Sequence, residues 1–403
     1  MQIYTFFSVF DHHFFNLQLS NFYYFCIVKI RFYNSTILLF ILLISNTLSA
    51  KTNDTIFVPN LQVELRTSYG FIICHHPEMK ALSTHLPLFE LSLDQATFGR
   101  KSWQSKSNYP TVGVSFLYSN LGGQPELGQA FAVIPHMTFH CLKSKRHQLS
   151  FKFGIGVGYV TKTFDRVTNP KNTFVGSHVN AAIDLSFDYN YMVTNRFGLK
   201  AFIGLTHLSN GANRSPNNGI NIAHAGIGAN YFLSQPKQRL PKQPSDNQQY
   251  KSWKKENISF YFAFSLSHKD IEEYLGYNKS WIVYNFQFNA LKRLTEMSKV
   301  GIGFDLVYDN TDKEVLGHKG IEFHDYEILK PGINAAYEIA FGNTSFMINF
   351  GCHIGGKDLC EGRVYQKLGA MQHLGKGVFV TIALTTHYGW ADYIGLGIGY
   401  RIH

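Results

Sequence analysis

Three side chains that together could form a hydrolase site lie close in the sequence: His207, Ser209 and Asn221. A serine hydroxyl attacks an ester only if a base removes its proton, and a third group must hold that base in one tautomer. His207 and Ser209 are two residues apart, so on a β-strand they would be neighbours on one face, with Cα atoms roughly 6–7 Å apart. Asn221 could then accept a hydrogen bond from the imidazole N–H. The three residue types therefore predict a Ser-His-Asn catalytic set.

The residues that follow Ser209 could stabilise the oxyanion of such a reaction. Asn210, Asn217 and the backbone N–H groups around Gly211 are the candidate donors. The alternative is structural, because His, Ser and Asn often occupy turns and a His-x-Ser triplet is common by chance. The choice depends on which way these side chains point.

The segments around the three residues alternate in polarity with a period of two, which is the pattern of β-strands. His207 and Ser209 continue the apolar face of 197–209, and Asn221 begins the apolar face of the next segment, 221–233. Phe202 and Leu208 are exceptions on the opposite face. In a soluble protein this apolar face would be a core, whereas in a membrane barrel it would face lipid, where polar groups are costly unless they are used.

The composition favours the membrane barrel. Among 403 residues there are 35 Phe and 23 Tyr, and charged residues make up only 16%. Beyond the N-terminal segment no stretch offers the roughly 18 apolar residues of a membrane helix. Alternation recurs through the chain, with Tyr at the ends of apolar faces as in interfacial girdles. The predicted fold is all-β, an antiparallel transmembrane β-barrel of the outer membrane.

The chain divides into four predicted regions. Residues 1–50 form an N-terminal extension and signal peptide, since Lys29 and Arg31 precede the apolar run 37–44 and Ala50 precedes a polar segment. Residues 51–233 form a barrel region that carries the site, 234–257 a polar linker or loop, and 258–403 a second barrel region. If 362–372 is also a strand, each half holds about eight, so one large barrel and two eight-stranded barrels both remain open.

The net charge and the cysteines restrict the classes of partner and metal site that the chain could have. The formal charge of +10 fits either a solvated surface or attraction to anionic lipid head groups. The predicted export and the absence of a basic stripe interleaved with aromatics argue against a nucleic-acid partner. Cys352 and Cys360 could pair in an oxidising compartment, although unpaired cysteines are favoured, and no CxxC spacing indicates zinc. Cys74-His75-His76 is expected to be a loop and no metal site is predicted.

The residues 207–211 and 216–220, His-Leu-Ser-Asn-Gly and Pro-Asn-Asn-Gly-Ile, resemble those of the PagL-type lipid A 3-O-deacylases and acyloxyacyl hydrolases. The resemblance implies an outer-membrane barrel whose histidine and serine face the outer leaflet. His207 would be the base, Ser209 the nucleophile, and Asn217 or Asn210 an oxyanion-site residue. The family's acidic orienting residue falls at Asn221, which is an amide here. The specific motif covers about residues 197–234.

Three functions follow as hypotheses. The first is a serine esterase of the outer membrane that removes an acyl chain from lipid A, with lipopolysaccharide as its partner and no cofactor. The second is an outer-membrane phospholipase A, whose orienting residue is Asn and for which resemblance implies calcium and a homodimer. The third is a non-enzymatic barrel or pore.

Thr386-His387, near the C-terminus, is similar to Thr206-His207. This second segment is expected to be inactive, because the alternation places His387 on the lumen-facing side of its strand.

Overall fold

The computed structural model describes residues 57–59, 61–234, 236–238, 240–241, 257–271, 279–357 and 362–402. The predicted signal peptide, most of the predicted linker, and the cysteines Cys26 and Cys360 lie outside these residues. Among the cysteines that are described, Cys74, Cys141 and Cys352 are free. Two short strands flank the first barrel region and pair with each other, β1 (Phe57–Pro59) and β10 (Pro236–Gln238).

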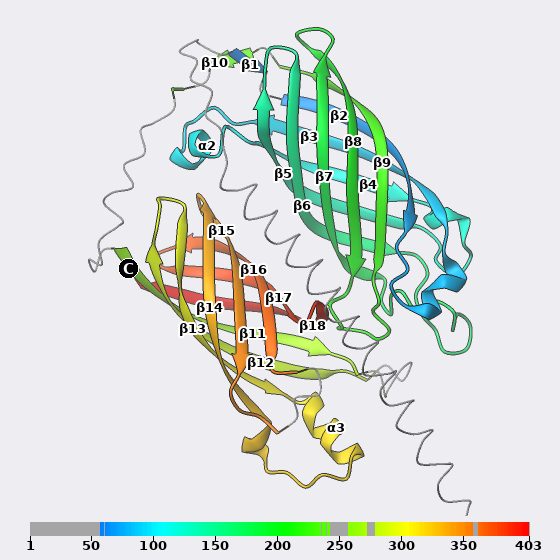
Figure 1. Ribbon diagram of the computed structural model, residues 1–403, viewed down its shortest axis with the longest axis vertical. Helices are drawn as coiled ribbons and strands as arrows, with labels where there is room; N and C mark the ends of the chain where they lie inside the picture. The colour runs from blue at the N-terminus through cyan, green and yellow to red at the C-terminus, as the bar shows by residue number, and fades with distance from the viewer. Residues whose placement is uncertain are drawn as a thin grey trace, which may run out of the picture. The chain divides into compact units, whose positions relative to one another are not determined.

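Eight strands of the first half form a closed antiparallel barrel, called barrel 1 here (Figure 1). They are β2 (Leu61–Ile72), β3 (His85–Ala96), β4 (Thr111–Ser119), β5 (Ala130–Lys143), β6 (His147–Val160), β7 (Val179–Met192), β8 (Phe197–Ser209) and β9 (Ile220–Phe232). Barrel 1 closes where β9 pairs with β2, with Ala225 opposite Tyr69. The short helices α2 (Ser102–Lys106), Pro77–Leu82 and Leu121–Gly123 lie in its connections.

The second half forms another closed antiparallel barrel, barrel 2. Its strands are β11 (Ile258–Lys269), β12 (Trp281–Arg293), β13 (Ser298–Asp309), β14 (Leu329–Phe341), β15 (Thr344–His353), β16 (Val364–Gly375), β17 (Val378–His387) and β18 (Trp390–Ile402). Helix α3 (Thr311–His318) and the 3-10 helix Asp325–Ile328 connect β13 to β14. The alternative of two eight-stranded barrels is therefore confirmed, and the expected strand near 362–372 is β16.

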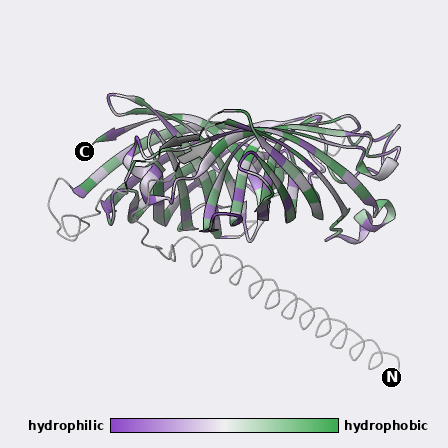
Figure 2. Ribbon diagram, turned by 90° about the horizontal axis from the view of Figure 1, so that it is seen from above, coloured by the Kyte–Doolittle hydropathy of each residue, from purple (hydrophilic) through white to green (hydrophobic). Residues whose placement is uncertain are grey.

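The period-two pattern explains both barrels. Outward residues are apolar and exposed to the surroundings, for example Leu65, Val157, Ile203 and Ile227, each at least 60% exposed. Figure 2 shows hydrophobic and hydrophilic residues alternating along the strands. An exposed apolar belt of this kind is stable in lipid, where a closed barrel also satisfies every backbone hydrogen bond. Among the residues described, no helix has the length and apolar character needed to cross a bilayer.

The lumen of barrel 1 is filled rather than open. Its central network joins three basic side chains to four acidic side chains that are at most 7% exposed: Arg66, Lys152 and Lys200 with Glu64, Glu90, Asp184 and Asp188. Towards the β8–β9 loop an apolar cluster takes over, which includes Leu208, Ile220 and Ile222. An eight-stranded barrel has just enough interior to hold its own side chains. Barrel 1 is consequently packed and does not form a channel.

The two ends of barrel 1 differ in the length of their connections. The loops 73–84, 120–129, 161–178 and 210–219 lie at one end, which we call the long-loop end. The opposite end has the turns 144–146 and 193–196 together with the α2 connection, 97–110. Outer-membrane barrels place short turns on the periplasmic side and longer loops outside. The long-loop end, where β8 ends, therefore lies at the outer leaflet.

Candidate active site

Strands β8 and β9 bring the three predicted catalytic residues together on the lipid-facing side of barrel 1. The register of the two strands places His207 directly opposite Asn221. Ser209 is the last residue of β8 and lies two positions beyond His207 on the same face. The inward residue between them, Leu208, is 1% exposed and packs in the apolar cluster of the lumen. The packing of Leu208 fixes the outward direction of His207 and Ser209.

The three side chains form a continuous hydrogen-bonded relay. The Oδ1 atom of Asn221 lies 2.7 Å from Nδ1 of His207, and Nε2 of His207 lies 2.8 Å from Oγ of Ser209. An amide oxygen only accepts, so Nδ1 of His207 carries the proton and donates it to Asn221. The Nε2 atom then accepts the hydrogen bond from the Ser209 hydroxyl. This tautomer is the one in which a histidine can take a proton from serine.

The asparagines of the β8–β9 loop hold its conformation beside the site. Oδ1 of Asn217 accepts from the backbone N–H of Asn210 at 2.9 Å. The side-chain amide of Asn210 donates to the carbonyl oxygen of Arg214 at 2.8 Å and to Oγ of Ser177 at 3.0 Å. Asn210 thus uses its amide to hold the loop, whereas no hydrogen bond within the described structure engages Nδ2 of Asn217. Of the two predicted oxyanion residues, Asn217 is therefore the one whose side-chain N–H groups remain available to donate to an oxyanion.

The preceding long loop supports this arrangement from behind. The carbonyl oxygen of Phe174 accepts from the backbone N–H of Gly219 at 2.8 Å. A Cβ atom on Gly176 would lie 2.7 Å from the carbonyl oxygen of Ser215, so the two loops approach closely there. Phe174, Gly176 and Ser177 were not identified from the sequence, since they are far from the motif and carry no spacing signal. The one signal available for Gly176 is its residue type, because glycine is the residue that allows two backbones to approach this closely.

Gly219 packs against the imidazole itself. Its φ of +75° lies in the left-handed region, and a Cβ atom there would sit 2.8 Å from Cε1 of His207. Both the backbone conformation and the ring therefore require glycine. The residue ends the loop immediately before β9, so it also sets the approach of that strand to the site.

Replacing Gly219 by alanine is expected to lower kcat by roughly ten- to hundredfold, because a small displacement of the base is enough to misalign it. The KM should change little, since the substrate surface is untouched. Deacylation of lipopolysaccharide, followed by mass spectrometry, measures both. Gly123→Ala is the matched control: Gly123 has a φ of +71°, but a Cβ there would meet nothing within 4 Å. Equal losses in the two variants would show that only backbone strain matters.

Two further groups that the sequence singles out, His387 and Cys74-His75-His76, form no second site within the described residues. His387 faces the lumen of barrel 2, as predicted, and bonds to the carbonyl oxygen of Val364 at 3.1 Å and to Asp392 at 3.2 Å. Cys74 and its two neighbouring histidines lie in a loop. Within the described ranges, no cluster of His, Cys, Asp or Glu has the arrangement to hold a metal ion.

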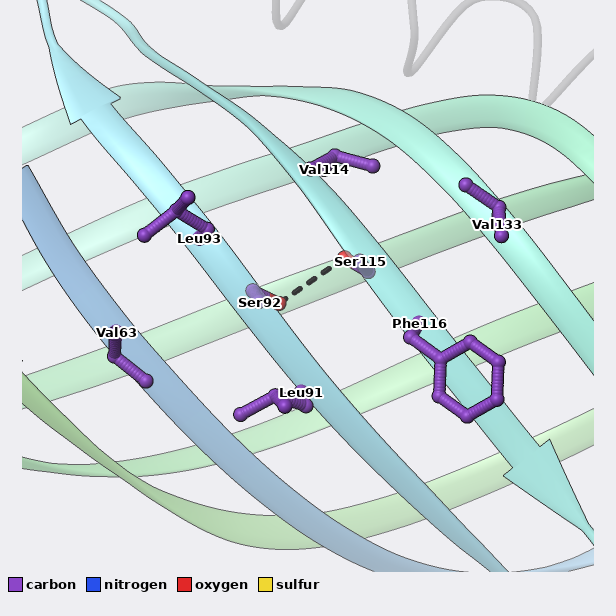
Figure 3. A pocket seen from close by; sticks show the side chains of 8 residues that line it. All are labelled: Val63, Leu91, Ser92, Leu93, Val114, Ser115, Phe116 and Val133. Carbon is purple, nitrogen blue, oxygen red and sulfur yellow. Dashed lines mark hydrogen bonds between the residues drawn. The ribbon is translucent and has the colours of Figure 1, made fainter.

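A hollow on the outer wall of barrel 1 is likewise unrelated to the site. Its outward rim consists of apolar side chains from β2 to β5, and behind them Ser92 and Ser115 bond to each other at 3.1 Å (Figure 3). The hydroxyl of Ser115 also lies 2.9 Å from Nδ1 of His136, whose Nε2 lies 2.7 Å from Oδ1 of Asp94. These three side chains are buried in the lumen of barrel 1, away from the lipid-facing wall. The hollow belongs to the lipid-facing surface.

Two family models match the two halves of the chain. The family model for lipid A 3-O-deacylase (PagL) matches residues 88–230, and the model for the C-terminal domain of acyloxyacyl hydrolase matches 257–403. Among solved structures, Neisserial surface protein A covers 43% of this chain and 97% of its own, at 9% identity and a TM-score of 0.32. The outer membrane enzyme PagL covers 41% and 97%, at 18% identity and a TM-score of 0.29. No curated protein matches.

The fold and the two family models define an ester hydrolase of the Gram-negative outer membrane. The chain belongs to the PagL family of lipid A deacylases, with the first model on barrel 1 and the acyloxyacyl hydrolase model on barrel 2. Its substrate is lipid A, the lipid anchor of lipopolysaccharide. The PagL match ends at residue 230 and so includes both strands, β8 and β9, that carry the relay.

Proposed function

We propose that barrel 1 removes an ester-linked acyl chain from lipid A by serine catalysis, with Ser209 as nucleophile and His207 as general base. The observation that carries the proposal is the relay from Ser209 through His207 to Asn221, on the lipid-facing side and at the outer-leaflet end. Polar groups are costly on that face. A hydrogen-bonded hydroxyl, imidazole and amide there suit a substrate that approaches from the membrane.

The chemistry follows from the geometry of the relay. As Oγ of Ser209 attacks the ester carbonyl, its proton passes to Nε2 of His207. Asn221 keeps the ring oriented by accepting from Nδ1–H. The backbone N–H of Gly211 and Nδ2 of Asn217 are placed in the loop next to Ser209 and would donate to the oxyanion. His207 then protonates the leaving alkoxide, and water, deprotonated by the same histidine, releases the fatty acid from Ser209.

The identity of the product tests the substrate. The full chain, refolded in detergent, would be incubated separately with lipopolysaccharide and with phosphatidylethanolamine, and the lipids analysed by mass spectrometry. Loss of one acyl chain from lipid A supports the proposal and also identifies the position cleaved. Release of lysophospholipid instead would favour the second candidate, an outer-membrane phospholipase A.

One observation favours that second candidate: Asn221 is an amide, as is the orienting residue of the outer-membrane phospholipases A that the motif resembles. Calcium and a dimer would accompany that function. The described residues of barrel 1 offer no cluster to hold a metal ion by themselves. We expect deacylation to continue when calcium is chelated, and a complete loss of activity in the chelator would count against the lipid A proposal.

The orienting role of Asn221 predicts a specific order of activities. Asn221→Ala removes the acceptor of the Nδ1 proton and should lower kcat by roughly ten- to hundredfold. Asn221→Asp keeps the acceptor and adds a charge that stabilises the protonated imidazole, so its kcat should be at least that of the wild type. Initial rates on lipopolysaccharide measure the series. Asn218→Ala, in the same loop but outside the relay, is the control, and an Asn221→Ala rate equal to it would exclude the orienting role.

A further inference from the structure

The short-connection end of barrel 1 carries a concentration of positive charge that the catalytic mechanism does not use. The connections 97–110, 144–146 and 193–196 contain six basic residues and no Asp or Glu: Arg100, Lys101, Lys106, Lys145, Arg146 and Arg196. At the long-loop end the charges are mixed, because Lys80, Lys162, Arg166, Lys171 and Arg214 are accompanied by Glu78, Glu126 and Asp165. The charge of barrel 1 is therefore strongly asymmetric along its axis.

Five of these side chains are exposed, and we call them the basic rim: Arg100, Lys101, Lys145, Arg146 and Arg196. None of them forms an ion pair with a carboxylate among the residues that the structure describes. A cation that folding leaves unpaired at one edge of a barrel remains available to anions from outside. In barrel 2 the corresponding turns are 294–297, 342–343 and 376–377, and their only charged residues are Glu296 and Lys376. The basic rim is therefore a feature of barrel 1.

Aromatic side chains show at which depth the basic rim lies. Nη1 of Arg146 donates to the hydroxyl of Tyr191 at 3.4 Å, and the ring of His147 lies 5.3 Å from that of Tyr191. Tyr189 bonds to His147 at 2.7 Å. Tyrosines at the ends of strands occupy the interface between lipid tails and head groups. The basic side chains just beyond them are consequently at the level of lipid phosphates.

We propose that the basic rim binds the phosphate groups of anionic phospholipids in the leaflet that faces the periplasm. Guanidinium and ammonium groups bind phosphate through charge-assisted hydrogen bonds. A row of them at head-group depth attracts anionic lipid over zwitterionic lipid. The site of Ser209 lies at the opposite end of barrel 1, so this binding is distinct from substrate recognition. It anchors the barrel in the inner leaflet and fixes the depth at which His207 meets the outer one.

The test compares lipids retained by the folded full chain. Wild type, the triple variant Lys145→Gln/Arg146→Gln/Arg196→Gln, and the matched control Lys80→Gln/Lys162→Gln/Lys171→Gln would each be folded into vesicles of phosphatidylcholine and phosphatidylglycerol. After mild extraction, native mass spectrometry gives the ratio of the two lipids that remain bound. Each basic group near an anionic surface changes affinity by about fivefold. The rim variant should therefore lose at least about fivefold of the phosphatidylglycerol enrichment, and high salt should have the same effect.

The outcomes separate the proposal from its competitors. Enrichment that falls in the rim variant and persists in the control supports it. An unchanged ratio in the rim variant, or an equal fall in the control, would overturn it. Binding of purified peptidoglycan through the rim, without lipid enrichment, would also overturn it by assigning the surface to another polymer. Unchanged deacylation of detergent-dispersed lipopolysaccharide by the rim variant would show that it is folded.

Discussion

Replacing Ser209 by alanine is expected to lower kcat/KM for lipid A deacylation by at least about 10³-fold, the largest effect on activity that the site predicts. The variant loses the only hydroxyl that bonds to Nε2 of His207 among the described residues. Neither the hydrogen bond between His207 and Asn221 nor the loop contacts of Asn210 involve Oγ of Ser209, so the rest of the site should keep its shape. Mass spectrometry of lipopolysaccharide at several times during the reaction measures the rate.

The control for this variant is another hydroxyl on the lipid-facing wall. Thr67 on β2 faces outward, opposite Ile227 of β9, and bonds to none of the site residues. Thr67→Val should retain the wild-type rate. A Ser209→Ala protein that releases fatty acid at the rate of Thr67→Val would remove serine from the mechanism, although the family assignment as a lipid A deacylase would stand.

The direction of the catalytic residues could be predicted because local alternation determines it. A strand has a period of two, so the apolar positions of 197–209 and 221–233 already placed His207, Ser209 and Asn221 on one face. The exceptions also have a physical reason. Phe202 points inward because the guanidinium of Arg66 lies 4.5 Å from its ring centroid, and Leu208 because the lumen is apolar near the long loops.

The support of the site could not be predicted, because it comes from loops. Ser177 reaches Asn210 from a loop that begins more than thirty residues earlier in the chain, and Phe174 reaches Gly219 in the same way. Loop conformation depends on such long-range contacts rather than on a repeating pattern. The preference between Asn210 and Asn217 as oxyanion donors required these contacts, since the two residues are equivalent in the sequence.

The number of barrels was open for a related reason. Alternation identifies strands, but it does not say whether β9 pairs back with β2 or continues to β11. The pairing of Ala225 with Tyr69 joins residues far apart in the chain, and only the assembled sheet reveals it. Each closure leaves no open edge within its barrel, which a lipid environment strongly favours.

Polar residues with the lumen-facing phase predicted a polar interior, but not which charges pair. Lys152 on β6 contacts Glu90 on β3 and lies 3.2 Å from Asp184 on β7. Asp184 in turn accepts from Oγ1 of Thr206 at 2.9 Å, directly behind His207 on β8. The network thus joins the far wall of the barrel to the strand that carries the base, and a change in it should affect both stability and catalysis.

Replacing Lys152 by methionine is accordingly expected to destabilise barrel 1 by about 3–5 kcal/mol, since removal of one partner leaves buried carboxylates without their cation. Lys152 is 2% exposed, so water cannot compensate. Urea unfolding in vesicles measures the change, with Lys145→Met on the exposed rim as the control, for which little change is expected. Adding Glu90→Gln should recover part of the loss, because it removes one of the stranded charges. If Lys152→Met were as stable as Lys145→Met, water would have to solvate the carboxylates in the lumen. The network would then not stabilise the wall behind His207.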